Sequence, residues 1–143
     1  MPKVSVSTET KAAPEQVWAV LTDLSRTPEW NAMHEGFTGD VPATVGEGST
    51  YKQKVKLMGM PAEMSWRVVT ADAPKHFEQA GDGPMGVKAK NRFLIEPTGE
   101  GSQITYEMEF AGPALNGPMA AMLEKQAGAS AKTALEKLSG LLG

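Results

Sequence analysis

From about Gly39 to Phe110 the sequence alternates apolar and polar residues in several segments, and turn-forming residues separate each segment from the next. Such alternation is typical of a strand that buries one face. The turn clusters are short and rich in Gly and Pro, at residues 45–48, 58–61, 72–74, 81–86 and 97–101. Because short turns of this kind join antiparallel neighbours, we expect five or six consecutive strands in one sheet.

The alternation gives this sheet an apolar face and a polar face. The inward rows are predicted to hold Tyr51, Gln53 and Val55, then Met64, Trp66 and Val68, then Val87, Ala89, Asn91, Phe93 and Ile95, and finally Ile104, Tyr106, Met108 and Phe110. The outward rows carry charged residues. In the last two strands these rows are opposite in sign, which favours antiparallel pairing of Lys88, Lys90 and Arg92 with Glu107 and Glu109.

The segments on either side of the sheet complete an α+β fold. Val4 to Thr10 have the alternation of a first strand. Pro14 opens a short helix, and Ser25 is the predicted N-cap of a second one that runs to Ala32. Residues 114–142 have helical spacing and predict one long terminal helix that lies on the apolar face of the sheet. Its apolar stripe is expected to hold Leu115, Met119, Met122, Leu123, Gln126, Ser130, Thr133, Ala134, Leu138, Leu141 and Leu142.

Composition excludes several classes of function. The chain has 143 residues, which suits one domain over 1–143, and no cysteine, which excludes disulfides, thiolate nucleophiles and cysteine-based metal sites. With 14 basic against 17 acidic residues, it lacks the positive surface that nucleic-acid binding needs. The N-terminal residues show no export signal, and no stretch is apolar enough for stable membrane insertion, so we expect a cytoplasmic protein.

No residues with catalytic or metal-binding spacing are found, so we predict no catalytic residue, no metal and no cofactor. The run from Gly81 to Gly86 matches the spacing of a dinucleotide-binding loop. Strand patterns flank this run on both sides and Pro84 lies inside it, which favours a hairpin instead. The two histidines, His34 and His76, have no partner at motif spacing.

The polar exceptions on the inward rows are Tyr51, Gln53, Asn91 and Tyr106. Buried amides and phenols need hydrogen-bond partners, which the protein, water or a ligand can supply. These four residues are therefore candidates for contact with a bound molecule.

In this order of elements, the segment from Asp23 to Trp30 and the turn from Val45 to Gly48 resemble the polyketide cyclase/dehydrase and START-like (SRPBCC) lipid-binding superfamily. The resemblance covers the whole chain. It implies the helix-grip fold of the birch-pollen allergen: a curved antiparallel sheet of six to seven strands around a long C-terminal helix, with two short helices after the first strand and a cavity for an apolar ligand. More narrowly, residues 58–61, 81–88 and 112–118 are similar to an actinobacterial branch described as the toxin of a type II toxin–antitoxin pair.

The leading hypothesis is a protein that binds or carries a small hydrophobic molecule, such as a lipid, a sterol-like compound or an aromatic polyketide. Ligand contacts are expected from Trp30, Tyr51, Gln53, Val55, Met64, Trp66, Phe77, Asn91, Phe93, Tyr106, Met108, Phe110, Met119, Met122 and Leu123. Apolar rows also build ordinary filled cores, so a core without a ligand stays open as an alternative.

Two further hypotheses belong to other classes. One is a polyketide cyclase or dehydratase in which Tyr106, Asn91 and His34 orient the substrate and move protons; no inward His, Asp or Glu supports it. The other is a toxin whose partner is an antitoxin protein, as the narrower resemblance implies. The sequence leaves both a monomer and a homodimer open.

Overall fold

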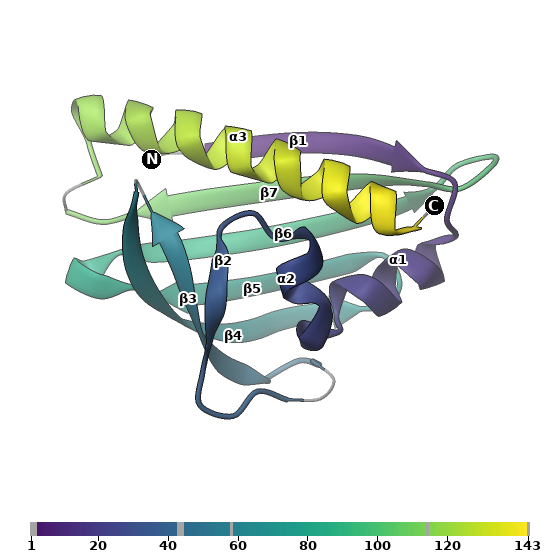
Figure 1. Cartoon of the computed structure of the whole chain (residues 1–143), viewed down its shortest axis with the longest axis horizontal. Coiled ribbons are helices and arrows are strands. Elements are labelled where there is room, and N and C mark those ends of the chain that lie inside the picture. Colours follow the sequence, from purple (N-terminus) through teal and green to yellow (C-terminus); the bar gives the residue numbers. More distant parts are fainter. Residues whose placement is uncertain (1–2, 43–44, 58, 114, 143) are drawn as a thin grey trace.

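The computed structural model describes residues 3–42, 45–57, 59–113 and 115–142. Within these residues, seven antiparallel strands form one sheet in the order β1-β7-β6-β5-β4-β3-β2 (Figure 1). The strands are β1 (Lys3–Thr10), β2 (His34–Thr38), β3 (Thr50–Leu57), β4 (Met60–Asp72), β5 (His76–Asp82), β6 (Lys88–Pro97) and β7 (Ser102–Ala111). Each strand from β2 to β7 pairs with its neighbour in the sequence, and β1 pairs with β7. The predicted antiparallel sheet is confirmed.

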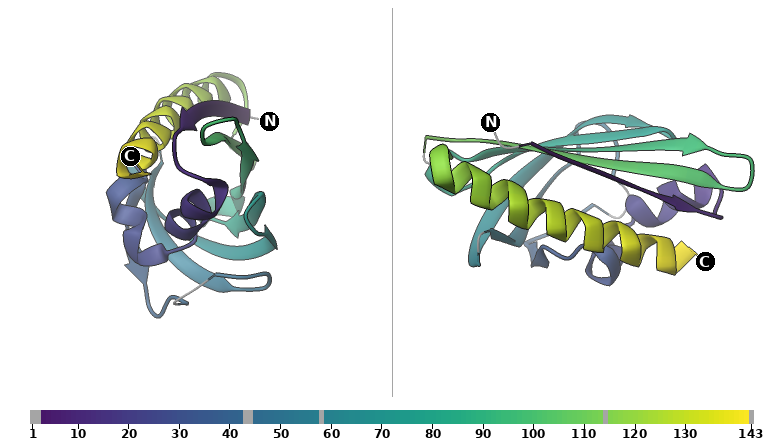
Figure 2. Two further views of the ribbon diagram at one scale, coloured as in Figure 1. Left: turned by 90° about the vertical axis from the view of Figure 1, so that its right-hand side faces the viewer. Right: turned by 90° about the horizontal axis from the view of Figure 1, so that it is seen from above.

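The helices α1 (Pro14–Leu21), α2 (Thr27–Trp30) and α3 (Gly117–Leu142) lie on one side of this sheet. Figure 2 shows the sheet curving around α1 and α2, with α3 running along its β1 side. The contacts of α3 are mainly with β1 and α2. This is the helix-grip arrangement that the resemblance implied. None of the helices in the described ranges is long and apolar enough to cross a membrane.

The second short helix is shorter than predicted. In place of a helix from Ser25 to Ala32, a 3-10 turn η1 (Leu24–Arg26) is followed by the single turn of α2. Asp23 rather than Ser25 caps this segment, because its Oδ1 accepts hydrogen bonds from the backbone N–H of Ser25 at 3.1 Å and from the Ser25 hydroxyl at 2.6 Å. The chain is extended at Asn31 and enters β2. The sequence analysis did not separate β2, because this short edge strand contains Gly36 and alternates weakly.

The buried face of α3 also differs from the predicted stripe. Gln126, Thr133 and Met122 are exposed, whereas the buried residues are Leu123, Ala127, Ala131, Ala134, Leu135 and Leu138. Small side chains let the helix approach the sheet closely; a Cβ at Gly128 would lie 3.8 Å from Val4 of β1. The predicted stripe contains Leu123, Ala134 and Leu138 but omits Ala127, Ala131 and Leu135, which complete the buried face. Position 114, where the helix was predicted to begin, and position 58 of the predicted 58–61 turn lie outside the described residues.

The division of the sheet into two faces agrees with the alternation. Inward residues such as Met64, Ile95 and Ile104 are almost fully buried. Outward residues such as Glu63, Lys90 and Glu96 are exposed. On the outer face Arg92 lies opposite Glu107, and Arg92 Nη1 is 3.0 Å from Glu107 Oε1, as the complementary rows predict. The apolar inner face is thus enclosed by helices, and the ion pairs lie outside it.

Candidate functional site

Two small cavities lie between the inner face of the sheet and the segment that runs from α1 to β2, each with a volume of about 30 Å³. The methionine cavity is lined by Asn31, Met33, Gln53, Val55, Met64, Trp66, Ala89, Asn91, Tyr106, Met108 and Phe110. The aromatic cavity is lined by Leu21, Leu24, Thr27, Trp30, Asn31, Phe37, Tyr51, Gln53, Phe77, Gln79, Asn91, Phe93 and Tyr106. They share Asn31, Gln53, Asn91 and Tyr106, so one polar cluster borders both.

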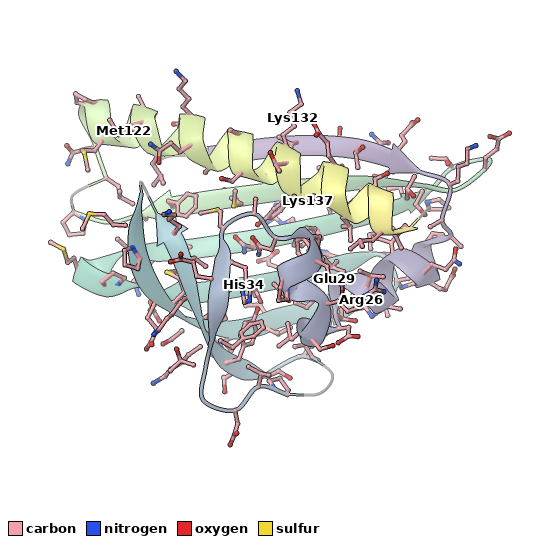
Figure 3. The ribbon with its side chains drawn as sticks, viewed as in Figure 1. Arg26, Glu29, His34, Met122, Lys132 and Lys137 are labelled. Atoms are coloured by element: carbon pink, nitrogen blue, oxygen red, sulfur yellow. The ribbon has the colours of Figure 1, made fainter. Side chains whose placement is uncertain are left out.

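Twelve of the fifteen residues expected to contact a ligand line one or both cavities: Trp30, Tyr51, Gln53, Val55, Met64, Trp66, Phe77, Asn91, Phe93, Tyr106, Met108 and Phe110. The other three belong to α3 and line neither cavity. Leu123 is buried, while Met119 and Met122 are 43% and 49% exposed; Figure 3 shows Met122 in the first half of α3. The reason is that α3 packs on β1 and α2 rather than over the strands that hold the cavities. Ligand contact by these residues stays a prediction.

Several lining residues were missed by the sequence analysis, above all Asn31 and Gln79. Gln79 is buried on the same side of β5 as Phe77, so its place in the alternation was a usable signal. Asn31 follows directly after Trp30 in the turn from α2 to β2. No periodic pattern marks a turn residue as inward, so Asn31 could not be found in this way.

A glycine on the neighbouring strand leaves the space that the Trp66 indole occupies. Gly81 pairs with Trp66, and a Cβ at Gly81 would lie 2.5 Å from the indole ring. Only glycine therefore allows the indole to lie flat over β5. In this position Trp66 Nε1 donates a hydrogen bond to Gln53 Oε1 at 2.9 Å.

This bond fixes the orientation of the next two groups. An indole N–H is only a donor, so the oxygen of Gln53 must face Trp66 and the amide nitrogen faces His34. Gln53 Nε2 lies 2.7 Å from His34 Nδ1 and donates to it, which requires Nδ1 to be unprotonated. The ring proton is then on Nε2. Burial lowers the pKa of His34, which also favours this neutral form. His34 lies on the edge strand β2 (Figure 3).

The two tyrosines differ in their partners. The Tyr51 hydroxyl donates to Gln79 Oε1 at 2.5 Å. Tyr106 stacks on Phe93 with ring centroids 4.1 Å apart, and no hydrogen bond reaches its hydroxyl from the described residues. Burial raises the pKa of both phenols. Both hydroxyls therefore stay protonated at neutral pH and act as hydrogen-bond donors rather than as bases.

The indole N–H of Trp30 is buried and has no hydrogen-bond partner within the described part of the chain. The Asn91 amide and the Tyr106 hydroxyl are two further neutral polar groups that line the cavities. Trp30 is 5% exposed and Asn91 is 9% exposed. Buried polar groups are almost always paired with protein or ordered water, so these three can accept a partner from outside the chain.

The cavity linings contain no Asp, Glu, Lys or Arg. No cluster of three or more His, Cys, Asp or Glu side chains that could hold a metal occurs in the described ranges. The site can therefore bury apolar surface and exchange neutral hydrogen bonds, but it offers no carboxylate pair for acid and base catalysis.

A larger hollow, of about 1080 Å³, lies on the outer face of the sheet. We call it the outer trough; its charged and hydroxyl side chains are Thr38, Asp40, Thr50, Lys52, Ser65, Arg67, Asp82, Lys88, Lys90 and Glu109. Lys88 Nζ and Asp82 Oδ1 pair at 2.9 Å within it. Most of these side chains are exposed. An apolar molecule would therefore bury less of its surface from water here than between the sheet and the helices. The inner cavities are thus the better candidate despite their smaller volume.

Comparison with known proteins agrees with this geometry. The sequence profile of the family described as polyketide cyclase / dehydrase and lipid transport matches residues 1–143. A Mycobacterium tuberculosis protein named as a toxin is 32% identical over 119 residues, which are 83% of each chain. An uncharacterized protein of the same organism is 29% identical over 143 residues and covers both chains completely. The structure of a START superfamily protein from Mycobacterium smegmatis covers 98% of this chain and 96% of its own, with 22% identity and a TM-score of 0.74.

Proposed function

Because the chain belongs to the polyketide cyclase / dehydrase and lipid transport family, we propose that it binds and carries a small hydrophobic molecule between the inner face of its sheet and its helices. The observation that carries this proposal is the buried, unpaired indole N–H of Trp30, which lines the aromatic cavity together with the polar side chains of Asn91 and Tyr106. A core that served only stability would be expected to pair such groups or replace them with apolar side chains. A ligand in the joined cavities would supply the missing partners.

The ligand must enlarge the cavities to enter. Each holds about 30 Å³, room for one or two water molecules, whereas typical ligand sites measure roughly 300–1,000 Å³. Met33, Met64 and Met108 line the methionine cavity. Methionine side chains are unbranched and repack easily, so they are the side chains that we expect to move aside.

Titration with a library of lipids and aromatic compounds tests the proposal, with tryptophan fluorescence as the readout. Trp30 and Trp66 line the cavities, so their emission should change on binding. We expect Ala89→Ile to weaken binding at least about tenfold, because Ala89 lines the methionine cavity and the larger side chain fills it.

The matched control is Ala80→Ile, the same substitution on the outer face of β5. It should leave the affinity unchanged, and circular dichroism should show that both variants keep the fold. The proposal fails if no compound changes the fluorescence of the wild-type protein, or if both variants bind as the wild type does.

A cyclase or dehydratase is the second candidate, supported by the family description. Tyr106 and Asn91 border both cavities and could orient a substrate, whereas His34 reaches the site only through Gln53. Turnover of an aromatic polyketide precursor that is lost in Tyr106→Phe would support the enzyme. Undiminished turnover in that variant would exclude this role for Tyr106.

A toxin is the third candidate, supported by the name of the relative that is 32% identical. We propose an antitoxin protein as its partner. Arrest of growth on expression, relieved by the product of a neighbouring gene, would support this function, and unaffected growth would contradict it.

A further inference from the structure

The polar groups at the cavities differ from those elsewhere on the sheet in carrying no charge. The inward rows of β3 and β6 place Gln53 and Asn91 at the cavities, while their neighbours Lys52, Lys90 and Arg92 point to the outer face. No lining residue of either cavity is a Lys or Arg. A buried carboxylate needs a cation or several donors to replace its hydration, and the interior provides no cation.

The neutral polar groups of Trp30, Tyr106 and Asn91 at the cavities are mostly hydrogen-bond donors. The indole N–H of Trp30 can only donate, and a phenol hydroxyl such as that of Tyr106 donates readily. Asn91 adds two donor positions and one acceptor oxygen. The other indole and phenol groups of the cluster are already occupied, because Trp66 bonds to Gln53 and Tyr51 bonds to Gln79. The site therefore offers hydrogen-bond donors to a ligand. Because no cation lines the cavities, the matching acceptor on the ligand should be uncharged.

Trp30 and Tyr106 lie on the same aromatic wall. Trp30 meets Phe93 edge-on with ring centroids 5.8 Å apart, and Phe93 stacks on Tyr106 at 4.1 Å. All three residues line the aromatic cavity. A ligand with a flat apolar group could pack against this wall. Its polar end would then lie in the aromatic cavity, which Trp30 and Tyr106 both line.

From these observations we infer that the interior site takes an uncharged apolar ligand that presents a carbonyl or ether oxygen to Trp30, Tyr106 and Asn91, and that it excludes carboxylates such as fatty acids. This inference rests on the proposed function and names the chemical class of its ligand. Two ligands of equal size and apolar surface should therefore differ in affinity when only one of them carries a charged head group.

Three derivatives of naphthalene that differ in one substituent test the inference by calorimetric titration: the methyl ketone, the ethyl compound and the carboxylate. We expect the ketone to bind about three- to tenfold more tightly than the ethyl compound, as one net hydrogen bond allows. The carboxylate should bind inside at least about tenfold more weakly than the ketone. Only binding that Ala89→Ile weakens and Ala80→Ile leaves unchanged counts as interior, because Ala80 lines the outer trough but neither cavity.

Trp30→Phe should remove the advantage of the ketone over the ethyl compound, measured as the ratio of the two affinities in the same variant. Trp18→Phe is the control for the same substitution elsewhere, because Trp18 is partly buried but lines neither cavity. If Trp30→Phe does not fold, Tyr106→Phe serves in its place and should reduce the same advantage.

The outcomes separate the two proposals. Interior binding of the carboxylate as tight as that of the ketone, or equal binding of the ketone and the ethyl compound, would overturn the inference and leave the proposed function standing. If none of the three compounds binds inside, the inference fails; the proposed function fails as well if the library of lipids and aromatic compounds also gives no fluorescence change.

Discussion

The two faces of the same strands show opposite solutions to the placement of polar groups. On the outer face, Arg92 bridges Glu78 and Glu107 with distances of 3.0 Å to each, in partial contact with water. On the inner face, Gln53 links Trp66 to His34 through neutral hydrogen bonds. On β5, the adjacent residues Glu78 and Gln79 take part in the ion pair with Arg92 and in a neutral hydrogen bond with Tyr51, respectively.

The difference follows from the cost of removing charge from water. An exposed ion pair keeps much of its hydration and contributes little to stability, whereas a buried charge needs a complete set of partners. Neutral amides and phenols can be buried with fewer partners, and the unpaired ones remain available to a ligand. The inner face therefore buries neutral polar groups, and the outer face carries the ion pairs that join neighbouring strands.

The largest effect is expected from loss of the inner aromatic wall. Phe93→Ala should lower the free energy of unfolding by about 3–5 kcal/mol, because it removes a buried ring that packs on Trp30 and Tyr106. Leu94→Ala, on the outer side of the same strand, should cost only about 1 kcal/mol. Urea denaturation of both variants gives the comparison, and equal losses would contradict the difference between the faces.

A second test inserts a charge into each face. Asn91→Asp should lower the free energy of unfolding by about 2–4 kcal/mol above pH 7, because a buried carboxylate has no cation beside it. Its folded pKa is raised, so the stability is present below the unfolded pKa and is lost as the pH rises through the folded one.

The control for this variant is Ser65→Asp on the exposed side of β4, beside Lys52. It should change the stability by about 0.5 kcal/mol or less at every pH. Denaturation from pH 4 to pH 8 measures both, and an Asn91→Asp variant without pH dependence would show that the cavities are more polar than described.

The free energy of unfolding should depend on pH to a smaller extent through His34. Burial lowers its pKa in the folded state, so the unfolded chain binds more protons in the window between the two pKa values. Stability should be complete above the unfolded pKa, near 6.5, and decline as the pH falls through the folded one, by about 1 kcal/mol or less for a partly exposed ring. Nuclear magnetic resonance titration should give a pKa below 6.5; His34→Asn should remove the dependence. A pKa above the ordinary value would refute the proposed tautomer.

The smallest effect is expected from the outer ion pairs. Burial tends to raise the pKa of Glu78, but hydrogen bonds from Arg92 and His76 outweigh it, and its pKa is lowered. Arg92→Met should cost about 0.5 kcal/mol, and the cost should shrink in concentrated salt. A loss as large as that of Phe93→Ala would mean that the outer network, not the apolar core, holds the sheet together.

The sequence predicts the two faces well because alternation records burial directly. The row from Ala89 to Ile95 and the row from Ile104 to Phe110 face inward, and twelve expected residues line the cavities. The positions that were missed depend on local or tertiary detail. Asp23 caps the turn in place of Ser25, and small residues such as Ala127 and Ala131 form the buried face of α3.

The hydrogen-bond partners within the site could not be predicted from the sequence. Alternation places Tyr51 and Gln53 inward but does not show that Tyr51 pairs with Gln79 while Tyr106 stays unpaired. That difference arises from register and ring orientation across several strands. The volume of the cavities has the same origin, since it depends on how methionines and aromatic rings fill the space between sheet and helices.

The most direct test of an interior site for an uncharged ligand is the indole N–H resonance of each of the three tryptophans, followed during titration with the methyl ketone of naphthalene. Trp30 should shift most, because its N–H gains a hydrogen bond, whereas Trp66 is already bonded to Gln53 and Trp18 lies outside the cavities. A titration in which the Trp30 resonance stays fixed while amides around Lys52 and Lys90 of the outer trough shift would contradict an interior site.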